Sequence, residues 1–233
     1  TFVRKAWTFA RQSLFGFKVS LLDKEAWLQL VEHFDLDDEI ADAAERDGED
    51  LSSVDLQKHV FEALNWTVRV LRKGIDIARE VIDFEDMIYM PLVSQIHVWQ
   101  KDAVLVDEAQ DTNPSRREFV AKILKPTGMS VWVGDPAQSI YGFTGADSDA
   151  IEIIKTRYGA VELPLTVTYR CPKKVVTMAQ RWVSHIQAHD TAPEGEVRTI
   201  NAEAILREGL RQGDGLDAIL CRNTKPLVEL CLA

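Results

Sequence analysis

The sequence has few cysteines and no long apolar run. Its three cysteines form no CxxC pair, and their odd number argues against a disulfide framework and for a reducing compartment. No stretch approaches the roughly 18 apolar residues that a membrane span needs, and the first residues lack the apolar region of a signal peptide. With 46% hydrophobic and 27% charged residues, the composition indicates a soluble globular protein. The chain begins at Thr1 rather than Met, which suggests an excised piece or a processed product.

Acidic residues are absent from the first twenty positions and concentrated in a later segment. Residues 1–20 carry four basic residues and no acid, whereas residues 35–55 carry ten acids against a single base. That segment accounts for most of the net charge of −10, and we expect it to be a solvated loop or helix margin. Net charge therefore neither supports nor excludes a polyanionic partner, because a local groove elsewhere can still bind one.

The first eighty residues have the apolar spacing of helices. In DKEAWLQLVEHF, Asp23 is the expected N-cap of a helix whose apolar residues share one face. A capping box from Ser52 to Asp55 is expected to begin a second helix, and Gly74 is expected to end it. This part of the chain is therefore predicted to be helical throughout.

Later residues alternate between strand and helix patterns. A helix is predicted over 84–99, entered at Asp83 and interrupted near Pro91. Short apolar runs at 103–107 and 130–135 flank a helix-length segment, which predicts a βαβ unit with parallel strands buried on both faces. A second set comprises strands predicted over 160–169, 196–200 and 216–222 and helices over 172–187 and 202–213. The predicted fold class is α/β.

Polar side chains follow both strands of the first βαβ unit. Because ligands of such sheets gather at the carboxyl ends of strands, Asp107 is a candidate for holding Mg²⁺ and Glu108 for polarising a water that attacks a phosphoryl group. The alternative is that both carboxylates cap the helix that begins at Asn113 and Pro114. After the second strand, the amide of Gln138 can donate to a phosphate and accept from a water at once, as a sensor of the γ-phosphate must.

Aromatic and basic side chains complete this set. Tyr141 and Phe143 lie on a glycine-punctuated loop where exposed rings can stack on bases, the alternative being burial between lobes. In TVTYRCP, Arg170 follows a strand of the second set and can reach a transferring phosphate. Tyr169 beside it can offer a flat face to adenine.

Two weaker patterns remain. His185 and His189 have i,i+4 spacing that suits a metal on a continuous helix, although a solvated helix end explains them as well. The basic and aromatic residues 1–12 can touch a DNA backbone or can pack their rings in a helix.

Three segments together resemble a known set of motifs. VDEAQD at 106–111, VGDPAQSIYGFTGAD at 133–147 and LTVTYRCP at 165–172 resemble motifs II, III and IV of superfamily 1 helicases of the UvrD/Rep type, in the same order and spacing. DFEDMIY resembles the Asp-Phe-rich stretch that precedes motif II, and LDAILCRNTKPLVELCLA resembles a later strand and helix of the family. The first eighty residues resemble the family's helical insertion only in position and helicity.

The resemblance implies a role for each candidate residue. Asp107 would bind Mg²⁺, Glu108 would activate the hydrolytic water, and Gln138 would link the phosphate to the DNA site. Tyr169 would stack on adenine, and Arg170 would contact the γ-phosphate.

Neighbouring residues follow the same comparison. Phe143 stands where the family usually has a tryptophan that stacks on a single-strand base, and Tyr141 is grouped with it as a DNA contact. Thr144 stands where an arginine is common, which puts any phosphate or DNA contact there in doubt. Gln110 and Asp111 match the family's Gln-Asp ending and are expected to tie motif II to motif III by hydrogen bonds.

The implied architecture is a pair of RecA-like P-loop NTPase lobes, each a parallel sheet flanked by helices, with a helical insertion. Residues 1–82 would form the insertion, 83–157 part of the first lobe and 158–233 the start of the second. The implied function is that of an ATP-dependent 3′–5′ DNA helicase or translocase that takes part in DNA repair. Its expected location is the cytoplasm, on the nucleoid if bacterial, or the nucleus if eukaryotic.

The implied cofactors are ATP and Mg²⁺, and the implied partner is single-stranded DNA or DNA with a single-stranded tail. No membrane contact is expected, and a protein partner from a repair or replication complex is left open. The sequence has no Gly-Lys dipeptide and hence no GxxxxGK[ST] loop, so this chain alone is expected to be inactive. The alternative is a non-catalytic, helicase-like module that binds DNA or a protein.

Overall fold

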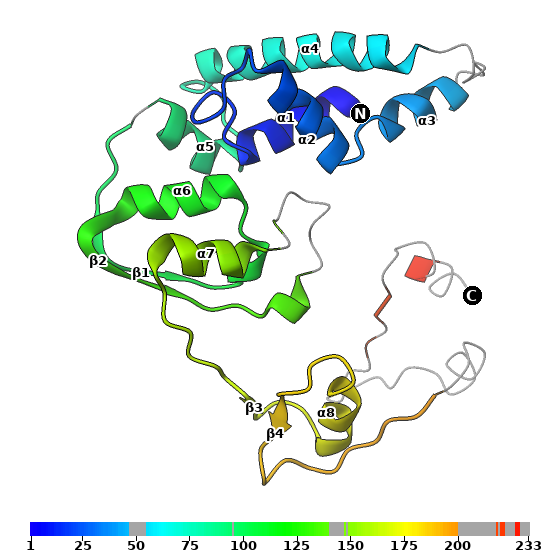
Figure 1. Ribbon diagram of the computed structural model, residues 1–233, viewed down its shortest axis with the longest axis vertical. Coiled ribbons are helices and arrows are strands. Elements are labelled where there is room, and N and C mark those ends of the chain that lie inside the picture. Colours follow the sequence, from blue (N-terminus) through cyan, green and yellow to red (C-terminus); the bar gives the residue numbers. More distant parts are fainter. Residues whose placement is uncertain are drawn as a thin grey trace. The chain divides into compact units, whose positions relative to one another are not determined.

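The computed structural model describes residues 1–46, 55–94, 96–139, 147, 149–199, 218, 220–221 and 227–228 (Figure 1). They fall in two compact units, Thr1–Glu162 and Leu163–Ala233, which are treated separately below. The fold is mixed α/β, in agreement with the predicted class. In the described part of the chain, no helix is both long and apolar enough to cross a membrane.

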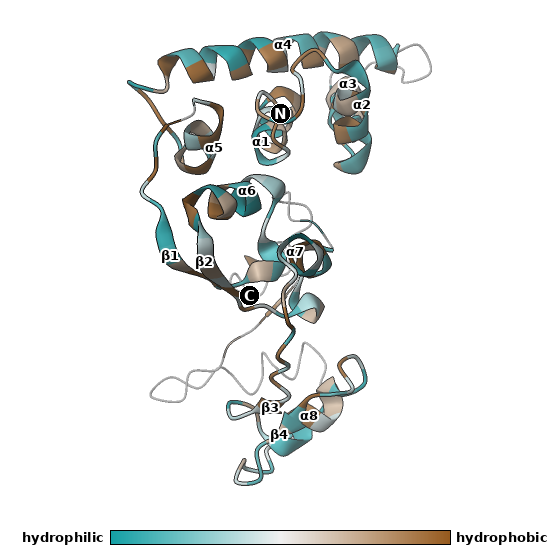
Figure 2. Ribbon diagram, turned by 60° about the vertical axis from the view of Figure 1, so that its left-hand side comes forward, coloured by the Kyte–Doolittle hydropathy of each residue, from teal (hydrophilic) through white to brown (hydrophobic). Residues whose placement is uncertain are grey.

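The first unit opens with a layer of helices. These are α1 (Phe2–Gln12), α2 (Lys24–His33), α3 (Asp38–Arg46), α4 (Leu56–Ile77) and α5 (Asp86–Val93). Figure 2 shows α4 lying along this layer, with apolar residues on the side it turns toward the other helices. Phe9 stacks on Phe34 with ring centroids 3.9 Å apart, and Phe15 packs on Trp27 at 4.2 Å. These rings belong to a continuous apolar core. Burial of this apolar surface is the main source of stability of the helical layer.

Helix ends agree with the sequence at α2 and differ at α4. The side chain of Asp23 accepts the Ala26 N–H at 3.0 Å, as predicted for an N-cap. The N-cap of α4 is Asp55, which accepts the Lys58 N–H at 3.1 Å, so the capping-box prediction is wrong; Ser52 itself lies outside the described residues. Gly74 does not end α4, which continues to Ile77. A single glycine costs a helix only about 1 kcal/mol relative to alanine, so the helix can pass through it.

The predicted helix over 84–99 is also shorter in the structure. Helix α5 covers only Asp86–Val93, with Pro91 inside it. Proline has no N–H to donate to the preceding turn, so the helix stops within a few residues of it. Residues 96–99 are not helical.

A buried arginine joins α1 to α5. The side chain of Arg11 is 2% exposed and forms a bidentate ion pair with Asp83, at 2.7 and 2.9 Å, and a second pair with Asp86 at 2.8 Å. Its guanidinium also lies 3.9 Å above the centre of the Trp7 ring. The hydroxyl of Ser115 donates to the carbonyl oxygens of residues 11 and 12. The N-terminal helix therefore packs its rings inward and leaves Arg4 and Lys5 exposed, which was one of the two alternatives for residues 1–12. The burial of Arg11 differs from the solvated charge that this alternative expected.

The predicted βαβ unit is confirmed. Strands β1 (Lys101–Val106) and β2 (Leu124–Trp132) are parallel and are joined through α6 (Pro114–Ile123). In Figure 1, α6 and the later helix α7 (Ala150–Tyr158) lie beside this two-stranded sheet. The ring of Tyr158 packs on Trp132, with centroids 5.3 Å apart, and its hydroxyl donates to the carbonyl of Arg117.

Burial of the strands on both faces is wrong for this sheet. Leu105 is paired in register with Val131, and Ala103 with Met129, so these side chains share one face. Leu105 is 76% exposed and Met129 is 63% exposed. Among the described residues of the first unit, this sheet has only the two strands β1 and β2, and helices cover only its opposite face. The result is an apolar stripe open to water.

This stripe should promote self-association of the isolated chain, because contiguous exposed apolar surface favours protein contacts. Replacing Leu105 by Lys places a charge at its centre and should shift the chain toward monomer in sedimentation velocity. Leu22→Lys is the matched control, since Leu22 is equally exposed, at 76%, but lies on the loop before α2. Equal association by both variants would show that the stripe is not the cause.

Three short elements are named among the described residues of the second unit. Strands β3 (Val167–Thr168) and β4 (Gln187–Ala188) pair in parallel, and α8 (Lys173–Ala179) lies between them in sequence. The helix predicted over 172–187 is wrong beyond Ala179, and residues 196–199 are not in a strand. Val176 is the single buried residue of α8. The helix therefore has little apolar contact that would stabilise further turns. The helix predicted over 202–213 and most of the strand over 216–222 lie outside the described residues.

Candidate active site at the ends of two parallel strands

Two exposed carboxylates lie at the carboxyl end of β1. Asp107 follows the last strand residue and accepts the N–H of Glu108 on Oδ1, at 2.9 Å. Glu108 has φ 51° and ψ 45°, a left-handed conformation that is uncommon for a residue other than glycine. The chain then turns into a short 3₁₀ helix, η1 (Ala109–Asp111). The N–H of Ala109 donates to the carbonyl oxygen of Val133, directly after β2, at 2.9 Å and fixes this helix in place. This turn directs both carboxylates away from the core.

A buried amide connects this turn to the end of β2. Gln110 is 2% exposed, and its Nε2 donates to Oε2 of Glu108 at 2.6 Å. Its Oε1 accepts the backbone N–H of Asp135 at 3.0 Å. The expected tie between the two loops is therefore made by Gln110. The buried Oδ1 of Asp111 makes no hydrogen bond within the described part of the chain. Residues 140–146 of motif III lie outside the described residues, so the expected tie through Asp111 stays a prediction.

Glycine is required at position 134 by this close approach. A Cβ atom added there would come within 2.6 Å of Gln110 Oε1 and 3.1 Å of Ala109. Real Cβ atoms are not found so close to a fixed oxygen, because the contact is well inside the sum of the atomic radii. The absence of a side chain at Gly134 is what lets the buried amide reach both loops.

The loop after β2 presents Gln138 at the same edge of the sheet. Asp135 caps the short helix η2 (Pro136–Gln138) by accepting the Ala137 N–H on Oδ1 at 2.9 Å. Its Oδ2 accepts from Nε2 of Gln138 at 2.7 Å. A continuous series of hydrogen bonds therefore runs from Glu108 through Gln110 and Asp135 to the exposed side chain of Gln138.

The two carboxylates do not cap the following helix. The N-cap of α6 is Asn113, whose side chain accepts the Arg116 N–H at 3.0 Å. Oδ2 of Asp107 and Oε1 of Glu108 take part in none of the hydrogen bonds or ion pairs of the described residues. Each carboxylate can therefore offer an oxygen to a ligand outside the sheet.

The other candidate residues lie elsewhere. Tyr141 and Phe143 fall outside the described residues, as does Thr144. Tyr169 and Arg170 belong to the second unit, directly after β3, and both are exposed. They are described only within that unit.

The histidine pair does not form a metal site. His185 and His189 lie beyond the end of α8, so the helical spacing that favoured a metal does not exist. Across the residues that the structure describes, no group of three His, Cys, Asp or Glu side chains could hold a metal ion.

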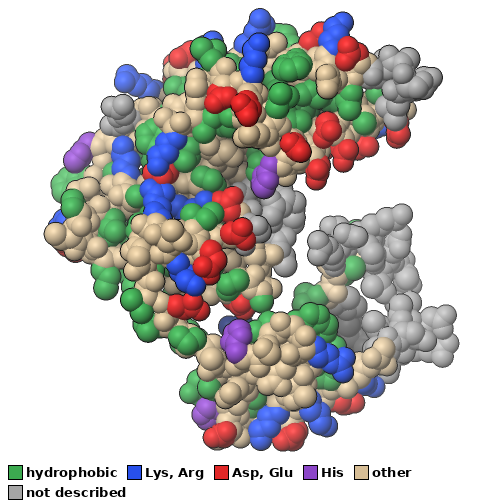
Figure 3. Space-filling view, in the orientation of Figure 1, with side chains coloured by type: hydrophobic (Ala, Val, Ile, Leu, Met, Phe, Trp, Pro, Cys, Tyr) green, Lys and Arg blue, Asp and Glu red, His purple; other side chains and the backbone are tan. Residues whose placement is uncertain are grey.

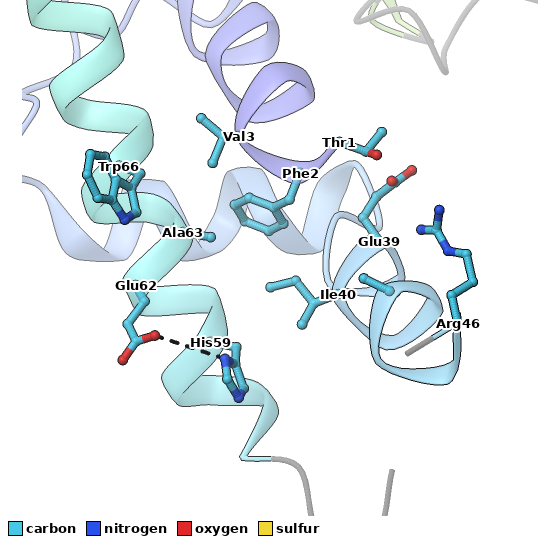
Figure 4. Close-up of a pocket in the computed structure, with 11 residues that line it drawn as sticks. Thr1, Phe2, Val3, Glu39, Ile40, Arg46, His59, Glu62, Ala63 and Trp66 are labelled. Carbon is cyan, nitrogen blue, oxygen red and sulfur yellow. Dashed lines mark ion pairs between the residues drawn. The ribbon is translucent and has the colours of Figure 1, made fainter. Parts of the chain in front are cut away.

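Other surface features of the first unit do not coincide with the carboxylates. Figure 3 shows acidic side chains gathered over α3, a surface that repels a phosphate backbone. A hollow between α1, α3 and α4 is lined by Phe2, Ile40, Ala63 and Trp66, with His59 4.0 Å from Glu62 at its rim (Figure 4). All of its lining residues come from the helical layer. The strand-end loops thus remain the place where polar groups converge.

Known proteins match this region. Residues 75–159 match the UvrD/REP helicase N-terminal domain family. The chain is 32% identical over 124 residues to a probable DNA helicase II homolog of Mycoplasma pneumoniae, an alignment that covers 48% of this chain and 17% of that protein. It is 28% identical over 156 residues to DNA helicase IV of Escherichia coli, covering 64% and 22%. With the Escherichia coli ATP-dependent DNA helicase Rep it shares 32% identity over 111 residues, covering 44% and 16%.

These matches, with the strand-end site, show that the chain is similar to DNA helicases of the UvrD/Rep type. The similarity to the UvrD/REP helicase N-terminal domain family covers residues 75–159. The match includes β1, α6, β2 and every strand-end residue of the first unit. The chain spans about a fifth or less of the length of these three relatives.

Proposed function

We propose that this chain is the part of an ATP-dependent 3′–5′ DNA helicase or translocase that positions the water and the metal at the γ-phosphate of ATP. The observation that carries the proposal is the pair of exposed carboxylates at the end of β1, one of them linked by a buried amide to the loop that holds Gln138. This arrangement places acidic and amide groups at the edge where parallel sheets bind phosphates.

The residues present fit a Mg²⁺ ion bound together with a nucleotide. Mg²⁺ commonly takes one or two protein carboxylates plus phosphate oxygens and waters. Asp107 has one oxygen engaged by a backbone N–H and one available, which suits a single ligand to such an ion. The bound ion would supply charge neutralisation on the phosphates.

Each remaining residue has a role that its chemistry supports. Glu108 would accept a proton from the attacking water, and its hydrogen bond to Gln110 would hold the carboxylate in place. Gln138 would respond to the γ-phosphate, because its exposed amide can exchange the Asp135 carboxylate for a phosphate oxygen. In the second unit, Tyr169 would stack on adenine and Arg170 would contact the γ-phosphate.

The proposed whole protein has two RecA-like lobes, with residues 1–82 as a helical insertion, 83–157 in the first lobe and 158–233 in the second. Single-stranded DNA would bind across Tyr141 and Phe143, whose rings would stack on bases. Such a protein would work on DNA in the cytoplasm or nucleus, and a partner from a repair or replication complex remains part of the proposal.

The test is ATP hydrolysis by the complete natural protein that contains this chain, measured with and without a single-stranded oligonucleotide. We expect hydrolysis that single-stranded DNA stimulates and blunt duplex does not, and no hydrolysis by residues 1–233 alone. DNA binding by the complete protein without any hydrolysis would favour the alternative of a non-catalytic, helicase-like module.

A further inference from the structure

Tyr169 and His189 directly follow the two paired strands β3 and β4 and lie next to each other. In the parallel register of β3 and β4, Val167 is opposite Gln187 and Thr168 is opposite Ala188. The next residues on each strand are therefore neighbours with side chains on the same face. The N–H of His189 donates to the carbonyl of Thr168 at 3.0 Å, which continues the pairing by one residue.

The two rings are stacked. Their centroids lie 4.4 Å apart and their planes are inclined by 29°. This is within the range of offset-stacked aromatic pairs, which attract each other beyond the area that they bury. Tyr169 nevertheless remains 78% exposed, so the stack occupies one part of its ring and leaves the rest to solvent.

The imidazole is itself held in place. Its Nδ1 accepts the backbone N–H of Thr191 at 3.3 Å and lies 2.8 Å from the Thr191 hydroxyl. Both contacts come from the turn that follows β4, so the ring orientation is set by backbone that is close in sequence. A fixed imidazole restricts the rotamers of the tyrosine that stacks on it.

We propose that His189 is a positioning residue that holds the Tyr169 ring as a platform for a purine base. The inference rests on the proposed function, in which Tyr169 contacts the base of the nucleotide. A free tyrosine side chain loses rotamer freedom when a base stacks on it, and that loss weakens binding. A ring already ordered by His189 loses less. The sequence did not indicate this role, because residues 172–187 were predicted to be one helix and the register between β3 and β4 was unknown.

The test is calorimetric binding of ADP to the complete natural protein, with inorganic pyrophosphate as the probe that lacks a base. His189→Ala should weaken ADP about fivefold, the effect of one aromatic pair, and should change pyrophosphate binding less than about twofold. His189→Phe keeps a flat ring and should restore ADP binding. His185→Ala is the matched control, because His185 is an exposed histidine of the same unit.

Three outcomes would overturn the proposal: unchanged ADP affinity in His189→Ala, equal weakening of pyrophosphate, or no restoration by Phe. The ring contact has its own readout in the 233-residue chain, where Tyr169→Leu should remove the ring-current shift of the His189 imidazole protons in NMR spectra. Absence of that shift in the unsubstituted chain would also contradict the platform. If ADP binds as expected but no ATP is hydrolysed, the platform stands and the proposed function fails.

Discussion

Replacing Glu108 by Gln is expected to lower ATP hydrolysis by the complete natural protein by about 10³-fold, the middle of the range for loss of a general base. Glutamine has nearly the same shape, and its oxygen can still accept from Nε2 of Gln110, so the turn between β1 and α6 should be kept. What disappears is the ability to take a proton from water. Steady-state hydrolysis with saturating single-stranded DNA measures the effect.

Asp102→Asn is the matched control for this experiment. Asp102 is also a carboxylate on β1, but it lies near the start of the strand, is 85% exposed and pairs with Lys125. Its substitution should leave hydrolysis within about twofold, because no strand-end group contacts it. Retention of more than a tenth of the activity in Glu108→Gln would remove Glu108 from the proposed role.

Replacing Arg11 by Met is expected to destabilise the first unit by about 3 kcal/mol, the lower end of the range for removing one partner of a buried ion pair. Methionine keeps most of the side-chain stem, whereas Asp86 loses its charge partner in a buried position and Asp83 loses two hydrogen bonds. The lower end applies because Asp83 is partly exposed and can recover some hydration. The expected fall in Tm is roughly 6 to 12 °C for a domain of this size.

Lys125→Met is the control for the arginine variant. It removes an ion pair of similar length, 2.7 Å, between two exposed side chains, and such pairs contribute less than about 1 kcal/mol. Thermal unfolding followed by circular dichroism compares the two. A similar fall in Tm for both variants would mean that the buried ion pairs of Arg11 stabilise the unit no more than an exposed ion pair does.

The arginine effect should depend on pH. Burial raises the pKa of the Asp83 carboxyl, but hydrogen bonding and attraction by Arg11 lower it more, so the pKa lies below its usual value. A carboxyl whose pKa is lowered by folding contributes stability above its unfolded pKa of about 3.9, and loses that contribution as the pH falls through the folded value. The difference in Tm between the unsubstituted chain and Arg11→Met should therefore be full at pH 7 and shrink below about pH 4.

The sequence predicted local and periodic features better than contacts between distant residues. Asp23 as an N-cap and the parallel βαβ unit depend on short-range patterns, and both are present. The exposure of Leu105 could not be predicted, because an apolar strand has the same sequence whether or not a neighbour covers it. Gly74 lies within its helix, because one glycine costs only about 1 kcal/mol and residues of α4 such as Leu71 are buried against distant helices, which no local signal for a helix end contains.

In the candidate site too, the sequence predicted the local positions better than the contacts between distant residues. The strand-end positions of Asp107, Glu108 and Gln138 follow from the order of strands and loops, and the structure places all three at one edge of the sheet in the first unit. The hydrogen bonds of Gln110 to Glu108 and to the N–H of Asp135 join two loops that are 25 positions apart, a contact that only the family resemblance predicted. Their chemical roles remain predictions for the experiments above.

The arginine cluster also determines how this chain can be shortened. Arg11 contacts Asp83 and Asp86, and Ser115 of α6 donates to the carbonyl oxygens of residues 11 and 12, so the first helix is attached to segments more than seventy positions away. Removing residues 1–82 would take a hydrogen-bond or ion-pair partner from side chains of α5, α6 and the residues before α5, among them Asp83, Asp86, Tyr89 and Ser115. A soluble truncated form should therefore begin before α1, and limited proteolysis should cut the loops of the helical layer without releasing α1 from the strands.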